Sequence, residues 1–193
     1  METLAKLFGN ESKVKIMRLF LFNEDTVFDT SEISERVKTD ISKVRKEINL
    51  LEKIGLIKKR AHKVSRKAGF VLNRQFDYLV PLQNFLINVE PFSDREIIAR
   101  VTKVGSIKLI VVAGVFIRES ESRVDILVVG DHIKKATLEN MIKNLEAEIG
   151  KELRYVYFST EDFKYRLSMC DKLMRDILDY PHKKVLNKLG IIE

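Results

Sequence analysis

Apolar residues recur at helical spacing through residues 10–54 and predict three helices in this stretch. Side chains able to cap a helix precede each of them, at Asn10, at Asp29–Ser31 and at Asp40. Gly55 follows the third helix, where a helix commonly ends. The three apolar faces carry Val14, Met17 and Leu21, then Ile33 and Val37, then Ile41, Val44, Ile48 and Leu51.

The pattern changes after Gly55. Leu56–Ile57 and Phe70–Leu72 are β-prone and flank a basic middle, which predicts a hairpin with a long exposed tip. A further helix is predicted at Tyr78–Ile87, with apolar positions Leu79, Leu82, Phe85 and Leu86. Pro91 then interrupts the chain, so we place a domain boundary between residues 88 and 93.

Strands and helices alternate in the rest of the chain. Their continuous apolar runs or alternation predict strands at Ile107–Ala113, Val124–Val129, Leu153–Phe158 and Lys184–Leu189. Helical spacing predicts helices at Ser93–Val101, Ala136–Ile149 and Thr160–Leu178, the last with a break at Cys170-Asp171. Two domains are therefore expected, residues 1–90 and residues 91–193, the second of α/β or α+β class.

Composition restricts the classes of function. The longest apolar run, Leu109–Ile117, is far shorter than the ~20 residues of a membrane helix. The first residues do not form a secretory signal, and the single cysteine excludes an intrachain disulfide, so we expect a cytoplasmic protein without a membrane partner. We expect Cys170 to be a small buried residue on a helix. The three histidines lie far apart without a second ligand at metal spacing, so no metal or cofactor is expected.

The positive charge is unevenly distributed. The chain has a net charge of +7, of which residues 1–90 carry +5 and residues 91–193 carry +2. The 24 residues from Lys53 to Phe76 hold eight cations and no acid. Such a block suits a polyanion such as nucleic acid, although on charge alone a solvated basic face explains it equally well.

The position of the basic residues favours duplex DNA as the partner. If the apolar stripe of the third helix faces a core, the opposite side carries Ser42, Lys43, Arg45, Lys46 and Asn49, with Glu47 off this face. The hairpin that follows adds Lys58, Lys59, Arg60, Lys63, Arg66 and Lys67. A helix of this kind fits the major groove while the hairpin reaches flanking phosphates. RNA is disfavoured because the strands offer no pair of aromatic residues for base stacking.

The stretch SEISERVKTDISKVRKEINLLEKIGLIKKR, residues 31–60, gives the chain a family resemblance. Residues 30–67 resemble the winged helix-turn-helix domains of ArsR-like and MarR-like prokaryotic transcriptional regulators. The resemblance implies an N-terminal winged helix-turn-helix (α+β) that binds DNA as a homodimer. The apolar residues of Tyr78–Ile87 then either contribute to the dimer or only close the core of the first domain.

A second resemblance concerns VAGVFIRESESRVDILVVG, residues 112–130. Residues 93–190 are similar to the minimal nucleotidyltransferase fold, which has a strand, a Gly-Ser or Gly-Gly turn, a loop and an Asp-x-Asp strand. Gly114, Val115, Arg123 and Asp125 take the corresponding positions. Arg123 replaces the first aspartate, Val115 replaces the small turn residue, and Leu153–Phe158 contains no third carboxylate. We therefore expect a degenerate α/β domain, with Arg123 and Asp125 paired to each other.

Together these patterns predict a sequence-specific DNA-binding transcriptional regulator that is not an enzyme. Its degenerate nucleotidyltransferase-like lobe would serve dimerisation, or the binding of a small-molecule or protein effector. The alternative is an active nucleotidyltransferase that transfers a nucleotide to a protein, an RNA or a small molecule and is recruited by its winged helix. Arginine rather than aspartate at position 123 favours the regulator.

Overall fold

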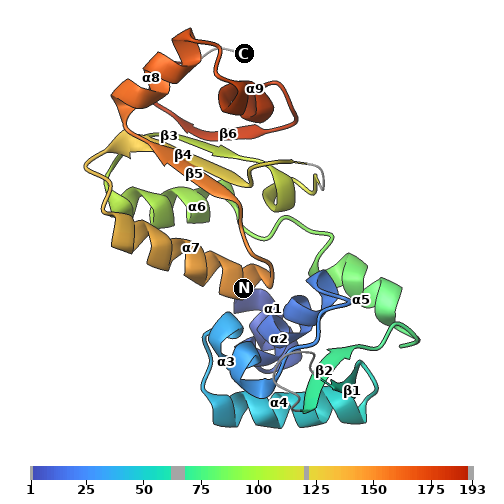
Figure 1. Ribbon diagram of the computed structural model, residues 1–193. Coiled ribbons are helices and arrows are strands. Elements are labelled where there is room, and N and C mark those ends of the chain that lie inside the picture. The colour runs from blue at the N-terminus through green and yellow to red at the C-terminus, as the bar shows by residue number, and fades with distance from the viewer. Residues whose placement is uncertain (1, 62–67, 120–121, 191–193) are drawn as a thin grey trace. The chain divides into compact units, whose positions relative to one another are not determined.

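The computed structural model describes residues 2–61, 68–119 and 122–190, as a mixed fold of helices and two small sheets (Figure 1). The chain divides into two compact units. The first unit contains Met1–Val89 and Asn144–Glu152, and the second contains Glu90–Lys143 and Leu153–Glu193. The expected second domain of residues 91–193 is thus interrupted by a segment that groups with the first unit. Across the described ranges, every helix is too short or too polar to traverse a bilayer.

Four helices begin the first unit, and three of them are the predicted ones. They are α1 (Glu2–Phe8), α2 (Glu11–Phe22), α3 (Thr30–Val37) and α4 (Ile41–Lys53). All three predicted N-caps are confirmed: the side chain of Asn10 accepts from Ser12 N, and those of Asp29 and Asp40 accept from the backbone two residues ahead. Helix α1 was not predicted, because one short helix that ends just before Gly9 offers too few apolar positions for a periodicity.

The predicted hairpin is present as β1 (Ile57–Ala61) and β2 (Ala68–Leu72), an antiparallel pair in which Ile57 lies opposite Leu72. Strand β2 is also bonded on its other side, where Phe28 and Phe70 exchange two backbone hydrogen bonds of 3.0 and 2.8 Å. Gly69 permits this approach, because a Cβ there would lie 2.6 Å from Val27 Cγ1. The Phe28 bridge was not foreseen, since one residue cannot show an alternating pattern.

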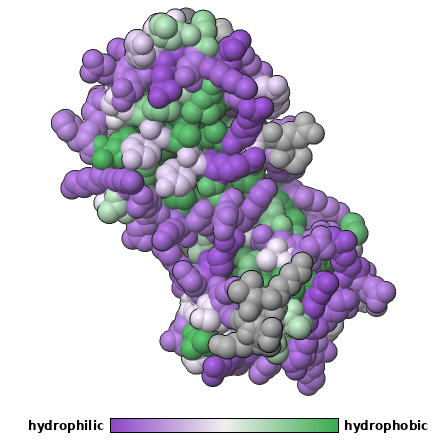
Figure 2. All heavy atoms as spheres, viewed as in Figure 1, coloured by the Kyte–Doolittle hydropathy of each residue, from purple (hydrophilic) through white to green (hydrophobic). Residues whose placement is uncertain are grey.

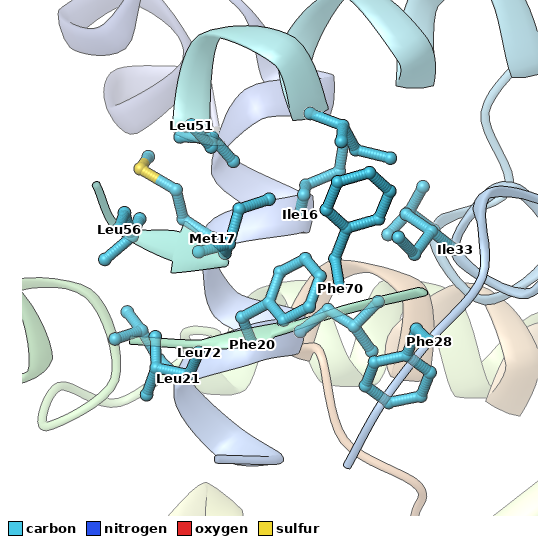
Figure 3. Close-up of a cluster of buried hydrophobic side chains, with 14 of the residues drawn as sticks. Ile16, Met17, Phe20, Leu21, Phe28, Ile33, Leu51, Leu56, Phe70 and Leu72 are labelled. Atoms are coloured by element: carbon cyan, nitrogen blue, oxygen red, sulfur yellow. The ribbon is translucent and has the colours of Figure 1, made fainter. Parts of the chain in front are cut away.

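A single apolar core holds α2, α3, α4 and the hairpin together. In Figure 3 the labelled side chains of this cluster point toward one another. The rings of Phe20 and Phe28 meet edge to face at 5.9 Å between centroids. Ile41 was expected in the apolar stripe of α4, but this prediction is wrong: it is 39% exposed, because it starts the helix and lies beyond the packed turns.

Helix α5 (Leu79–Leu86) closes this core. Leu86 is fully buried, and Leu79 and Leu82 are partly buried against the same cluster. Leu86 therefore takes the second of the two roles left open for it, closing the core of the first domain, and it offers no surface to a second copy of the chain. Phe85 is 47% exposed, with its ring 6.1 Å from that of Phe8.

Arg18 on α2 is buried within the first unit and is satisfied by backbone carbonyls. Its Nε donates to Leu86 O at 3.0 Å and its Nη1 donates to Glu148 O at 3.0 Å. Burial lowers the pKa of the guanidinium, and the charge of Glu148 opposes this shift. Arg18 thus holds the end of α5 and the segment Asn144–Glu152 in the first unit.

The second unit is built on a four-stranded mixed sheet of order β5-β4-β3-β6. Its strands are β3 (Ser106–Val112), β4 (Ile126–Asp131), β5 (Tyr155–Phe158) and β6 (Lys183–Asn187). Its helices are α6 (Asp94–Val101), α7 (Lys135–Ile149), α8 (Thr160–Ser168) and α9 (Lys172–Leu178), with short 3-10 turns at Thr102–Val104 and Gly114–Phe116. Strand β3 is antiparallel to both β4 and β6, and β4 is parallel to β5. The predicted strands and helices are confirmed, apart from shifts at their ends.

Helices cover both faces of this sheet. Figure 1 shows α6 and α7 on one face and α8 and α9 on the other. Leu109 and Val111 of β3 and Leu127 and Val129 of β4 share a buried cluster with Phe163 of α8. Asp131 at the end of β4 accepts from Thr160 N at 3.1 Å and from the Thr160 hydroxyl at 3.0 Å, and these bonds lower its pKa.

Cys170 lies between α8 and α9, so the predicted break in this helical stretch is confirmed. Its predicted burial is wrong. The residue is exposed and has a left-handed backbone with φ of 49°, because it lies in the turn that follows α8 and not in the helix.

Two adjacent leucines of α4 test the packing of the first unit. Leu51 is 1% exposed and Leu50 is 41% exposed. We expect Leu51→Ala to lower the free energy of unfolding by about 2–5 kcal/mol, because it leaves a cavity in the core. Leu50→Ala, the control on the same helix, should change it by about 0.5 kcal/mol or less. Urea denaturation followed by circular dichroism measures both, and equal losses in the two variants would contradict this packing.

Candidate functional site

Helix α4 presents one continuous polar side to solvent. Ser42, Lys43, Arg45, Lys46 and Asn49 are all exposed, and together they form what we call the outward face. Val44, Ile48 and Leu51 are buried on the opposite side of the helix. Hydrophilic residues also predominate in Figure 2 where Figure 1 places α4 and β1.

Strand β1 adds a second group of exposed cations directly after α4. Lys58, Lys59 and Arg60 are exposed, and the chain reaches them through Gly55, which has φ of 82°. The predicted contacts of Lys63, Arg66 and Lys67 lie outside the described residues.

An ion pair between the helix and the hairpin shows which side of α4 lies next to β1. Lys59 Nζ lies 3.0 Å from Glu52 Oε1. Glu52 follows Arg45 by two helical turns and so shares its side of α4. The cations of β1 therefore continue the outward face on the side of Arg45.

Glu47 does not disturb this positive surface. Its predicted position off the outward face is confirmed, and its side chain is buried. Its Oε1 accepts from Asn10 Nδ2 at 2.7 Å, and Lys13 Nζ lies 3.8 Å from its Oε2. Its charge is thus directed toward the start of α2 and away from the outward face.

The beginning of α4 contains a hydrogen bond that sequence analysis missed. Asp40 Oδ1 accepts from Ser42 N at 2.8 Å and from the Ser42 hydroxyl at 2.6 Å. The hydroxyl bond, followed by the backbone bond, lowers the pKa of Asp40, so its carboxylate is ionised at neutral pH. The spacing Asp-x-Ser indicated the cap but not the direction of the hydroxyl.

The second unit brings three of the four other predicted residues together at one end of its sheet. Gly114 follows β3 with φ of 55°, and Asp125 directly precedes β4 and is fully buried. Asp125 Oδ1 accepts from Val115 N at 3.2 Å. Its Oδ2 accepts from Arg154 N at 2.9 Å and from Arg154 Nε at 3.1 Å. Gly114, Val115 and Asp125 are therefore brought together, with Arg154 as a partner that sequence analysis missed.

The predicted ion pair between Arg123 and Asp125 is wrong. Arg123 is exposed, and its Nη1 pairs with Asp176 Oδ2 of α9 at 2.7 Å. The prediction assumed the alternation of a strand, but β4 begins only at Ile126. The segment before β4 directs Asp125 inward while Arg123 faces solvent. Arg154 could not be found from local spacing, because it is far from Asp125 in the chain.

These bonds decide what Asp125 can do chemically. Both of its oxygens already accept hydrogen bonds, and its nearest charged partner is a cation. Among the described residues, no cluster of three or more His, Cys, Asp or Glu side chains is arranged to hold a metal ion. The carboxylate thus acts here as an acceptor that joins the turn after β3 to the start of β5.

The chain matches no family model, no curated protein and no solved structure. Its candidate sites are therefore defined by side-chain geometry alone: the outward face of α4 with the cations of β1, and the group around Asp125.

Removing Asp125 should weaken the second unit more than removing Arg123. We expect Asp125→Ala to lower the free energy of unfolding by about 2–4 kcal/mol, because it leaves buried donors without an acceptor. The half-exposed guanidinium of Arg154 keeps the loss below that of a fully buried pair. Arg123→Ala, which breaks only an exposed pair, should cost less than about 1 kcal/mol.

Tyrosine fluorescence during urea denaturation can follow this loss, because the second unit contains all the tyrosines except Tyr78. A larger loss in Arg123→Ala than in Asp125→Ala would contradict the structural role of Asp125.

Proposed function

We propose that the protein is a sequence-specific DNA-binding transcriptional regulator. The observation that carries this proposal is the outward face of α4, with its polar and cationic side chains continued by Lys58, Lys59 and Arg60. The width of the DNA major groove admits one α-helix, and Arg, Lys, Asn and Ser side chains can reach base edges and phosphates. In this arrangement α4 binds in the major groove, and the hairpin contacts phosphates of the DNA backbone beside it.

The order of elements supports a winged helix-turn-helix for the first unit. Helices α3 and α4 are joined by a tight connection in which Lys38 has a left-handed backbone with φ of 49°. The antiparallel hairpin follows α4 as the wing, and Phe28 gives β2 a second bonded neighbour. The first helix of such a motif crosses the backbone while the second enters the groove, which assigns base contacts to α4.

The second unit would be a nucleotidyltransferase-like lobe without catalytic activity. Its order of strand, Gly114 turn, strand, helix and parallel strand supports the fold resemblance. Arg154 at the start of β5 supports the loss of chemistry, because it brings a cation to Asp125 where catalysis would require divalent metals. The lobe then serves self-association or the binding of an effector.

Two measurements test the DNA-binding proposal: the dependence of affinity on salt concentration, and the effect of removing cations from β1. If about six phosphates are contacted, affinity for duplex DNA should fall by roughly 10³-fold between 50 and 200 mM salt. Replacing Lys58, Lys59 and Arg60 together by alanine should weaken binding to all sequences alike. The slope of log affinity against log salt concentration should become less steep by about one for each phosphate contact that is lost. Gel-shift titrations over a range of salt concentrations measure both effects.

The control for this experiment is a triple alanine variant at three exposed lysines of the second unit: Lys103, Lys164 and Lys172. It removes the same charge but should leave DNA affinity nearly unchanged. Binding without salt dependence, or equal losses in the two triple variants, would remove DNA from the proposal.

A nucleotide-transfer assay tests the inactive lobe. The wild-type protein is incubated with labelled nucleoside triphosphates, Mg²⁺ or Mn²⁺, and RNA and protein acceptors. We expect no transfer, because both Asp125 oxygens are occupied by hydrogen bonds. Label transferred by the wild type and by Arg123→Ala, and lost in Asp125→Asn, would establish an enzyme instead.

A further inference from the structure

Ser42 lies in the middle of the outward face when α4 is viewed along its axis. Buried Val44, Ile48 and Leu51 define the inner side of the helix. At 3.6 residues per turn, Ser42 lies almost opposite them, in line with Lys46 and Asn49. Ser42 belongs to the first turn of α4, and the first turn of a recognition helix approaches the base edges most closely.

The hydrogen bonds around Ser42 determine which role its hydroxyl can play. Asp40 is an ionised carboxylate that can only accept, so the 2.6 Å bond commits the hydroxyl proton to Asp40 Oδ1. The lone pairs of Ser42 Oγ are not used by this bond, and Ser42 is an exposed residue. Ser42 therefore presents an acceptor to any group that faces it.

We propose that Ser42 is a specificity-determining residue that selects a base carrying a major-groove amino group, adenine or cytosine, and that Asp40 fixes this choice by taking the hydroxyl proton. The inference rests on the proposed DNA-binding function and adds the base class read at one position. In the major groove, adenine N6 and cytosine N4 donate, whereas guanine O6 and N7 and thymine O4 accept. Guanine or thymine would place an acceptor against the acceptor of Ser42.

The size of the preference follows from one neutral hydrogen bond. A net contribution of roughly 1 kcal/mol corresponds to a preference of about 3- to 10-fold at this position. Lys43, Arg45 and Lys46 carry donors only, so the acceptor supplied by Ser42 is chemically distinct from them. Asp40 acts through Ser42 and is a positioning residue.

The chain offers a matched control for this motif. Asp29-Thr30-Ser31 stands at the start of α3 with the same spacing as Asp40-Ile41-Ser42 at the start of α4, and Asp29 Oδ1 accepts from Ser31 N at 2.8 Å. Asp29 also takes part in a capping box with Glu32. Since α3 is assigned to the DNA backbone, Ser31→Ala should leave base preference unchanged.

The experiment selects binding sites from a pool of randomised duplexes, using full-length wild type, Ser42→Ala, Asp40→Gly and Ser31→Ala. Glycine is tolerated at an N-cap far better than alanine, so Asp40→Gly should remain folded, which circular dichroism checks. The wild type should show one position with about 3- to 10-fold preference for adenine or cytosine. Ser42→Ala should flatten that position alone, and Asp40→Gly should admit guanine and thymine there, because the freed hydroxyl can donate.

The outcomes separate this inference from the proposed function. A wild type that binds duplex DNA with steep salt dependence, but whose selected sites are identical in Ser42→Ala, overturns the role of Ser42 while DNA binding stands. The same conclusion follows if the preferences in Asp40→Gly do not broaden, or if the wild type binds without selecting any sequence. A wild type that binds no duplex overturns the proposed function itself.

Discussion

The burial of one side of α4 decides what this helix can present to solvent. Val44, Ile48 and Leu51 pack in the core of the first unit, which leaves the helix no freedom to rotate about its own axis. Ser42 and Asn49 face outward as a geometric consequence of that packing. Base recognition, as proposed here, thus depends on apolar residues that never touch DNA. A less well packed core would let the polar side chains of α4 adopt a wider range of orientations, while the charge of the surface would stay the same.

The two units use carboxylates in different ways. In the first unit, Asp40 is exposed and accepts the hydrogen bond of the Ser42 hydroxyl, which fixes the direction in which that hydroxyl donates. In the second, Asp125 is fully buried and joins the turn after β3 to the start of β5 through bonds from Val115 and Arg154. Magnesium would compete for the same oxygen lone pairs that these donors occupy. A residue type suited to metal chemistry therefore acts here as a structural acceptor.

The elements that the sequence predicts correctly are those whose signal is local. Helix caps such as Asp29 and Asp40 and the β-prone ends of the hairpin act on residues close by in the chain, so their positions follow from spacing. The periodicity of α4 also identifies its outward face, because helical geometry alone relates its buried side to its exposed side.

The errors come from features that local spacing does not contain. Arg154 reaches Asp125 from a distant part of the chain, and the residues around Asp125 contain no pattern that predicts this contact. Ile41 fits the apolar stripe, yet it starts the helix where no neighbour covers it. Cys170 fits a buried helical position by sequence, but it lies in a left-handed turn between α8 and α9. In each case the missing information is the arrangement of neighbours in three dimensions.

The close approach of Gly114 to Asp125 restricts which residues can stand at either position. A Cβ at position 114 would overlap Asp125 Oδ1, and the backbone there has φ of 55°. Any larger residue at 114 must displace the carboxylate, and the displaced carboxylate would abandon its donors on Val115 and Arg154. A side chain at 114 therefore meets two obstacles, the left-handed backbone and the carboxylate, and a smaller residue at 125 would remove only the second. Because that smaller residue would also leave the donors on Val115 and Arg154 without an acceptor, a change at either position carries a cost that a change at the other does not relieve.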